Sequence, residues 1–74
     1  MSNVSSISAV SVNLENVIQQ LEKAIDCVVH TEVNLSMLED LISIHSRLRS
    51  DLRSANAVKH DVDAMLEKLI SKQD

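Results

Sequence analysis

The sequence contains no glycine, no proline and no aromatic residue, and only one of its 74 residues is a cysteine. Without glycine and proline, β-hairpin turns and glycine-rich phosphate-binding loops lose the residues on which they normally depend. Without aromatic side chains, the chain lacks platforms on which the bases of a single-stranded nucleic acid stack. A single cysteine excludes an internal disulfide bond. Together these absences favour an all-α protein.

Charge and hydropathy narrow the classes further. The formal net charge is −4, which argues against a nucleic-acid-binding protein because such proteins normally carry a basic surface. No stretch is long and apolar enough to span a membrane. Residues 1–12 carry no side-chain charge and lack the basic start and apolar run of a signal peptide. We therefore expect a cytoplasmic chain, although the uncharged, serine-rich N-terminus is also compatible with export that uses no signal peptide.

The strongest pattern lies between Leu38 and Leu69, where seam residues alternate in steps of three and four. This spacing is the heptad pattern of a packed helix, and it predicts a long helix over about 36–71. Since no proline or glycine interrupts it, we expect one continuous helix. The alternative is a three-helix bundle with a break near 54–57, where the apolar stripe is narrow. The seam comprises Leu38, Leu41, His45, Leu48, Leu52, Ala55, Lys59, Val62, Leu66 and Leu69.

A second heptad pattern predicts a shorter helix over about 13–30, beginning at Ser11 or Asn13 as N-cap. Its seam comprises Leu14, Ile18, Leu21, Ile25 and Val28. Ser36 and Glu39 have the form of a capping box at the start of the second helix. The two helices are expected to form an antiparallel hairpin with a coiled-coil-like seam, as a single domain over 13–74. Serine and β-branched residues disfavour an isolated helix over 1–12, so a flexible N-terminal arm is expected there.

An antiparallel register follows if seam residues meet in layers across a short connection. The expected layers are Val28 with Leu38, Ile25 with Leu41, Leu21 with His45, Ile18 with Leu48, and Leu14 with Leu52. In this register the last turns of the second helix have no partner within the hairpin. Because leaving so many apolar side chains in water is unfavourable, we expect these turns to be covered by the N-terminal arm, by a second copy of the chain or by another protein. The predicted partner-binding residues are Val58, Val62, Met65, Leu66, Leu69 and Ile70.

Few residues suggest chemistry. Cys27 and His30 are spaced as two metal ligands on one helix face, but a site needs at least one more ligand nearby. No nucleophile elbow, phosphate loop or zinc-protease motif occurs, and a two-helix hairpin offers little concave surface. We therefore expect no metal, no cofactor, no small-molecule substrate and no enzymatic activity. His45 and Lys59 occupy seam positions, where polar residues can set register or oligomeric state.

Three functions are compatible with this construction. The first is a small helical interaction protein, such as an adaptor, co-chaperone or assembly subunit, that completes a helical bundle with a partner. The second is a structural protein that assembles with copies of itself as a homodimer or higher oligomer. The third is an acidic regulator or inhibitor of another protein, whose binding would weaken strongly with salt.

Overall fold

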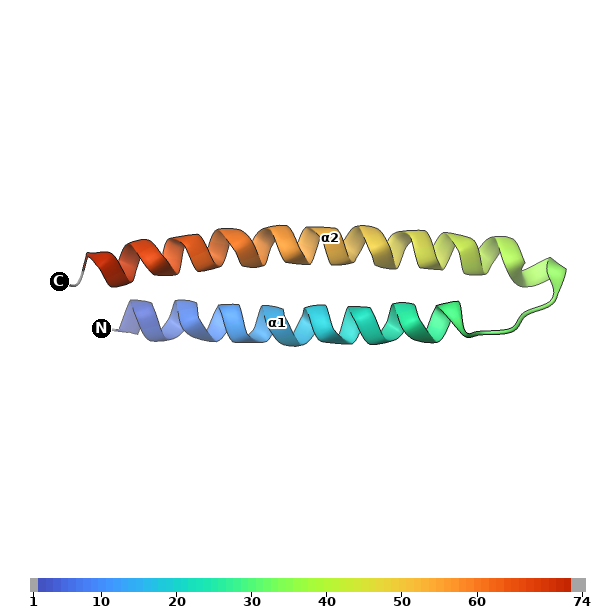
Figure 1. Ribbon diagram of the computed structural model, residues 1–74, viewed down its shortest axis with the longest axis horizontal. Coiled ribbons are helices and arrows are strands. Elements are labelled where there is room, and N and C mark those ends of the chain that lie inside the picture. The colour runs from blue at the N-terminus through green and yellow to red at the C-terminus, as the bar shows by residue number, and fades with distance from the viewer. Residues whose placement is uncertain (1, 73–74) are drawn as a thin grey trace.

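The computed structural model describes residues 2–72 and consists of two antiparallel helices joined by a short connection (Figure 1). Helix α1 spans Ser2–Val29 and helix α2 spans Leu35–Ser71. The hairpin is a thin rod of 60 × 14 × 13 Å. The predicted all-α helical hairpin is confirmed. Since α2 runs without interruption through residues 54–57, the favoured single helix is correct and the three-helix alternative is wrong.

The first helix begins about three turns earlier than expected. Residues 2–12, predicted to be a flexible arm, are helical; Met1 lies outside the described residues. Val4 and Ile7 continue the alternating seam through Ser11 to Leu14, and all four side chains are half-buried. Packing of an apolar stripe against a second helix outweighs the low intrinsic helix propensity of serine and β-branched residues. The prediction of an unstructured arm is therefore wrong for residues 2–12.

The register also differs from the expected one, by one heptad. Lys59 Nζ lies 3.9 Å from Glu15 Oε2, whereas the expected layers placed Leu52 beside that turn of α1. The Ser11 hydroxyl donates a hydrogen bond to Asp63 Oδ1 at 2.6 Å, which gives the same offset. The longer α1 explains the shift, because the added turns cover the C-terminal half of α2. Its apolar seam is therefore packed within the hairpin.

The connection between the helices is built without glycine. Asn34 is the N-cap of α2, and its side chain accepts a hydrogen bond from the Met37 backbone N–H at 3.2 Å. The predicted cap, Ser36, instead donates its hydroxyl hydrogen bond to Asn34 Oδ1. At the end of α1, the Thr31 hydroxyl donates to the Cys27 carbonyl at 2.6 Å. No residue within 2–72 takes a positive φ, so this turn never needs the left-handed conformation that glycine favours.

The core is a single line of side chains. Among the side chains of residues 3–72, only Ile18 is buried, with 6% of its surface exposed. The other seam residues are at most half-buried. The first turns of α2 extend past the end of α1 (Figure 1), and Leu35 is 87% exposed there. The unpaired end of α2 is therefore its N-terminal end, opposite to the end predicted.

Candidate interaction surface

The six predicted partner-binding residues divide into two groups. Val62, Leu66 and Leu69 are half-buried in the seam against α1. Val58, Met65 and Ile70 remain about half exposed, at 49%, 49% and 51%. All six would be accessible if α1 ended opposite Leu52, which the structure contradicts. The first group packs within the hairpin, and the second group stays accessible from outside.

Two of the accessible residues belong to a larger surface, which we call the apolar flank. It consists of five side chains that are all between 43% and 49% exposed: Val10, Val17, Ile44, Val58 and Met65. Each directly precedes a seam residue, as Val17 precedes Ile18 and Met65 precedes Leu66. In an antiparallel helix pair, these positions of both helices fall on the same side of the seam. Ala24 and Asp51 occupy the positions of this line between the flank residues, and Asn3 and Met37 occupy its outermost positions.

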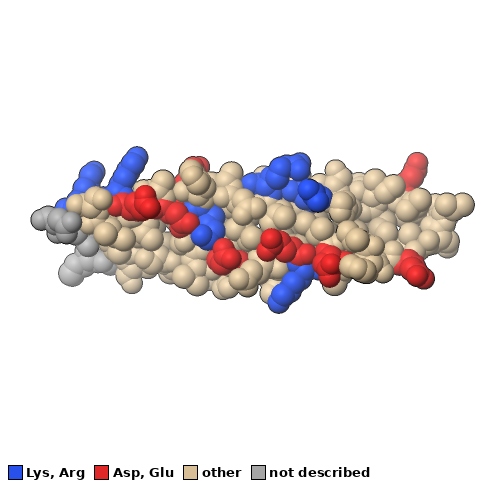
Figure 2. Space-filling model, in the orientation of Figure 1, with Lys and Arg blue, Asp and Glu red and all other residues tan. Residues whose placement is uncertain are grey.

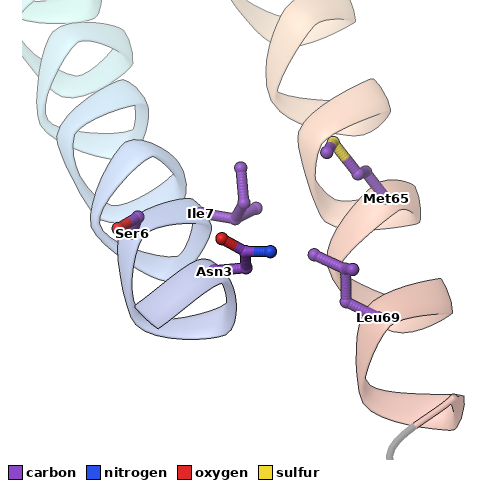
Figure 3. Close-up of a pocket in the computed structure, with 5 residues that line it drawn as sticks. All are labelled: Asn3, Ser6, Ile7, Met65 and Leu69. Atoms are coloured by element: carbon purple, nitrogen blue, oxygen red, sulfur yellow. The ribbon is translucent and has the colours of Figure 1, made fainter. Parts of the chain in front are cut away.

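The apolar flank is hollowed in two places. One open hollow of about 340 Å³ lies along α1 and is lined by Asn16, Val17, Gln20 and Leu21. The other, of about 250 Å³, lies between the ends of the two helices. Ile7 and Asn3 point from α1 toward Met65 and Leu69 of α2 around this second hollow (Figure 3). Side chains of another helix pack into grooves of this kind beside exposed apolar side chains.

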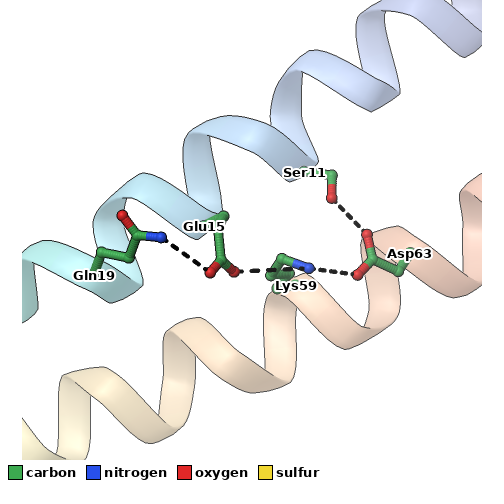
Figure 4. Close-up of polar contacts among 5 residues, drawn as sticks. All are labelled: Ser11, Glu15, Gln19, Lys59 and Asp63. Carbon is green, nitrogen blue, oxygen red and sulfur yellow. Dashed lines mark hydrogen bonds and ion pairs between the residues drawn. The ribbon is translucent and has the colours of Figure 1, made fainter. Parts of the chain in front are cut away.

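The opposite side of the seam is polar in the middle of the rod, whereas toward the ends it carries the exposed apolar residues Val29, Ile42 and Ile70. Lys59 lies between two carboxylates, with its Nζ 2.8 Å from Asp63 Oδ2 and 3.9 Å from Glu15 Oε2 (Figure 4). Ser11 donates to the other oxygen of Asp63, and Gln19 donates to Glu15 at 3.4 Å. We call Ser11, Glu15, Lys59 and Asp63 the polar cluster. It joins the two helices through charge-assisted contacts, which constrain how they align.

These contacts change the proton affinities of the two central groups. The hydrogen bond to Asp63 raises the pKa of Lys59 above its usual value, against a smaller opposing effect of desolvation. The same hydrogen bond, assisted by the one from Ser11, lowers the pKa of Asp63. Both shifts favour the charged forms. The ion pair is therefore maintained at neutral pH.

The two predicted register residues have different environments. Lys59 is half-buried in the seam, and its charge is satisfied by the polar cluster. His45 is half-buried nearer the loop, where it lines an open hollow of about 170 Å³ with Val28, Val29, Leu41 and Ile42. Only Lys59 is thus placed in an interaction that selects one alignment of the helices. The pairing of Lys59 with Ser11 and Asp63 was not predicted; the polar residue at seam position 11 was the available signal.

The described surface has few features of a catalytic or metal-binding site. Within residues 2–72, no three histidine, cysteine or acidic side chains converge to hold a metal ion, and Cys27 is an exposed free thiol. The three hollows described above are open to solvent. Figure 2 shows acidic and basic side chains interspersed over both helices on one face of the rod, with fewer at the loop end. This mixture of charges is not an extended field of one sign.

Comparison with family models, with curated protein sequences and with solved structures finds no match to this chain. In the described part of the chain, neither helix has a segment of the length and apolarity needed to cross a membrane. The surface itself therefore carries the functional argument.

Proposed function

We propose that this chain is a small, non-enzymatic helical interaction protein that completes a helical bundle with a protein partner. The observation that carries this proposal is the apolar flank. Its five aliphatic and thioether side chains recur at heptad positions on both helices and remain 43–49% exposed. Exposed apolar side chains grouped along one side of a helix pair mark interaction sites, and their heptad spacing matches the face of another helix.

This flank revises the predicted binding surface. Val58 and Met65 are retained, and Val10, Val17 and Ile44 are added from the structure. Val62, Leu66 and Leu69 support the flank from the seam, since they are half-buried against α1. The proposed occupant is a protein rather than a nucleic acid, because the chain has a net charge of −4. The roles of adaptor, co-chaperone and assembly subunit all use such a surface.

An acidic regulator is less well supported than a bundle-forming protein. Such an inhibitor needs a field of negative charge to occupy a basic site, whereas acidic and basic side chains are mixed on the face in Figure 2. In the polar cluster, two carboxylates are committed to Lys59 within the hairpin. The proposal also keeps the cytoplasmic location that the sequence predicts.

Affinity capture from a native lysate, followed by mass spectrometry, tests this function. The tagged chain is expected to retain partner proteins that a Val58→Asp, Met65→Asp variant loses. Val12→Asp is the matched control, because Val12 is 61% exposed and lies outside the apolar flank. The proposal is contradicted if the wild-type chain neither captures a protein nor associates with itself. It is also contradicted if the flank variant captures the same proteins as the control.

A further inference from the structure

We propose that the partner seated on the apolar flank is a second copy of this chain, forming a four-helix bundle in which the two loops lie at opposite ends. This inference rests on the function proposed above and specifies its partner. Three features of the hairpin carry it: the area it leaves exposed, the charge pattern bordering the flank, and the arrangement of the flank residues themselves.

The exposed area is the first feature. A compact monomer of 8.2 kDa exposes about 4,500 Å², whereas this chain exposes 5765 Å². The excess is about 1,200 Å², and a standard interface removes about 800 Å² from each partner. A dimer burying that excess on both copies falls in the range of obligate homodimers. The hairpin thus has the surface of half of a bundle.

The charge pattern of α2 is the second feature, and it selects a second copy. An exposed polar residue stands three residues after Met37, Ile44, Asp51, Val58 and Met65, which are the positions of α2 that directly precede a seam residue. In order along the helix these polar residues are Asp40, Arg47, Ser54, Asp61 and Lys68. The pattern reads negative, positive, neutral, negative, positive. When this order is reversed about Ser54, each charged position coincides with a position of opposite charge.

A two-fold axis near Ser54 therefore pairs every charge with its opposite. In an antiparallel α2–α2 contact, Asp40 faces Lys68 of the second copy and Arg47 faces Asp61 of the second copy. A parallel contact instead places Asp40 against Asp40 and Arg47 against Arg47. Like charges at matched positions are unfavourable and opposite charges favourable. The pattern selects the antiparallel arrangement, with the loops at opposite ends.

The same axis aligns the flank, which is the third feature. About Ser54, Ile44 falls level with Met65 of the second copy, and Val58 falls level with Asp51 of the second copy. The two Asp51 carboxylates are thereby separated, whereas a parallel arrangement would bring them together. Such an interface is isologous, with one surface serving both copies. The hollow beside Met65 then lies where side chains of the second copy's α2 arrive.

Sedimentation equilibrium on the untagged full chain, from about 1 to about 200 μM, tests the dimer directly. The expected mass is about 16 kDa at the upper concentrations, twice the 8.2 kDa of one chain. Val58→Asp is expected to return the mass to one chain, while the control Val12→Asp stays dimeric. Circular dichroism verifies that each variant remains helical.

A charge-swap cycle tests the orientation with substitutions on the exposed surface, where folding is little affected. Arg47→Glu is expected to raise the dimer Kd about tenfold, because it converts two attractive contacts per dimer into repulsive ones. Adding Asp61→Arg restores opposite charges at both contacts, so the double variant is expected to return close to the wild-type Kd. In a parallel dimer this rescue cannot occur.

The outcomes separate this inference from the function on which it rests. A wild-type chain that stays monomeric at every concentration overturns the homodimer, as does a dimer that Val12→Asp disrupts and Val58→Asp does not. A dimer without charge-swap rescue overturns the antiparallel arrangement. If the monomeric chain still captures a different helical protein through the flank, the proposed function stands without the inference. A monomer that captures nothing contradicts both.

Discussion

The two sides of the seam in this hairpin share the same helices and the same heptad geometry, yet in the middle of the rod they are built from opposite chemistry. On one side, the apolar flank leaves Val17 and Val58 half exposed and without polar partners. On the other side, Lys59, Asp63 and Glu15 contact one another across the helices. An apolar surface packs against whatever fits it, whereas charged groups need particular partners at particular levels. The comparison indicates that the polar side aligns the hairpin and the apolar side is available to another chain.

The largest expected effect comes from a test of the alignment of the two helices. The contacts of the polar cluster place Leu52 level with Leu21, whereas the sequence-based register placed it level with Leu14. In a Cys27→Ser background, Leu21→Cys with Leu52→Cys is expected to form a disulfide readily. Leu14→Cys with Leu52→Cys is expected not to, because one heptad is about 10 Å along a helix and disulfides require close Cβ atoms.

Mass spectrometry under non-reducing conditions distinguishes the two cross-links. Efficient intramolecular bonding of position 14 to position 52 would show that the polar cluster does not set the register. Intermolecular products are separated by mass and serve as a measure of association.

A second prediction compares neighbouring residues that lie on the two kinds of surface. Ile18→Ala is expected to lower the free energy of unfolding by about 2–4 kcal/mol, because Ile18 is the most buried of the described side chains and its loss leaves a cavity. Val17→Ala, one position away on the apolar flank, is expected to cost under about 1 kcal/mol in the isolated hairpin. Urea unfolding monitored by circular dichroism at low chain concentration measures both. Equal losses would mean that the flank is already packed in the isolated hairpin.

The dependence of stability on pH should be the smallest of these effects and belongs to the polar side alone. The folded state lowers the pKa of Asp63, so its contribution is present above the usual aspartate value of about 3.9 and is lost as the pH falls below it. The folded state raises the pKa of Lys59, so that contribution is present below about 10.4 and is lost as the pH rises above it. Both are constant between about pH 5 and pH 9.

Thermal unfolding of the wild type and of Asp63→Asn from about pH 2 to about pH 7 checks the assignment. The variant is expected to lose part of the acid-side change in Tm and to show a lower Tm at pH 7. Val58→Ala serves as the control, since it alters no titrating group. An unchanged acid profile in Asp63→Asn would exclude Asp63 as the responsible group.

Much of the fold was predictable because heptad spacing is a local property of the sequence. The steps from Leu38 to Leu69 defined α2, and the steps from Leu14 to Val28 defined most of α1. The first turns of α1 were missed because Ser8 and Ser11 dilute the apolar stripe that Val4 and Ile7 begin. Their helical state depends on contact with α2, which helix propensity does not include.

The register was not predictable from the apolar residues for a related reason. Two regular heptad patterns mesh equally well after a shift of seven residues, so the choice depends on polar partners such as Ser11 and Asp63. Two residues of the apolar flank, Val58 and Met65, were predicted from the sequence. They were predicted as part of an unpaired C-terminal end of α2, which the structure instead packs against α1. Val10 and Val17 could not join them while the N-terminal residues were expected to be a flexible arm.

The tight, glycine-free connection between Val29 and Leu35 also governs the order in which the hairpin closes. Residues beside this turn meet after closing a short loop, whereas Ser11 and Asp63 are 52 positions apart. The entropic cost of closing a loop grows with the number of residues in the loop. Folding that starts at the turn and proceeds toward the chain ends therefore has the lowest entropic cost. Amide hydrogen exchange in the isolated chain should therefore be slowest in the middle of the rod near Ile18 and fastest at the far end, beyond Ile7 and Leu69. That end is where the second hollow of the apolar flank lies, so a bound copy should slow exchange there most.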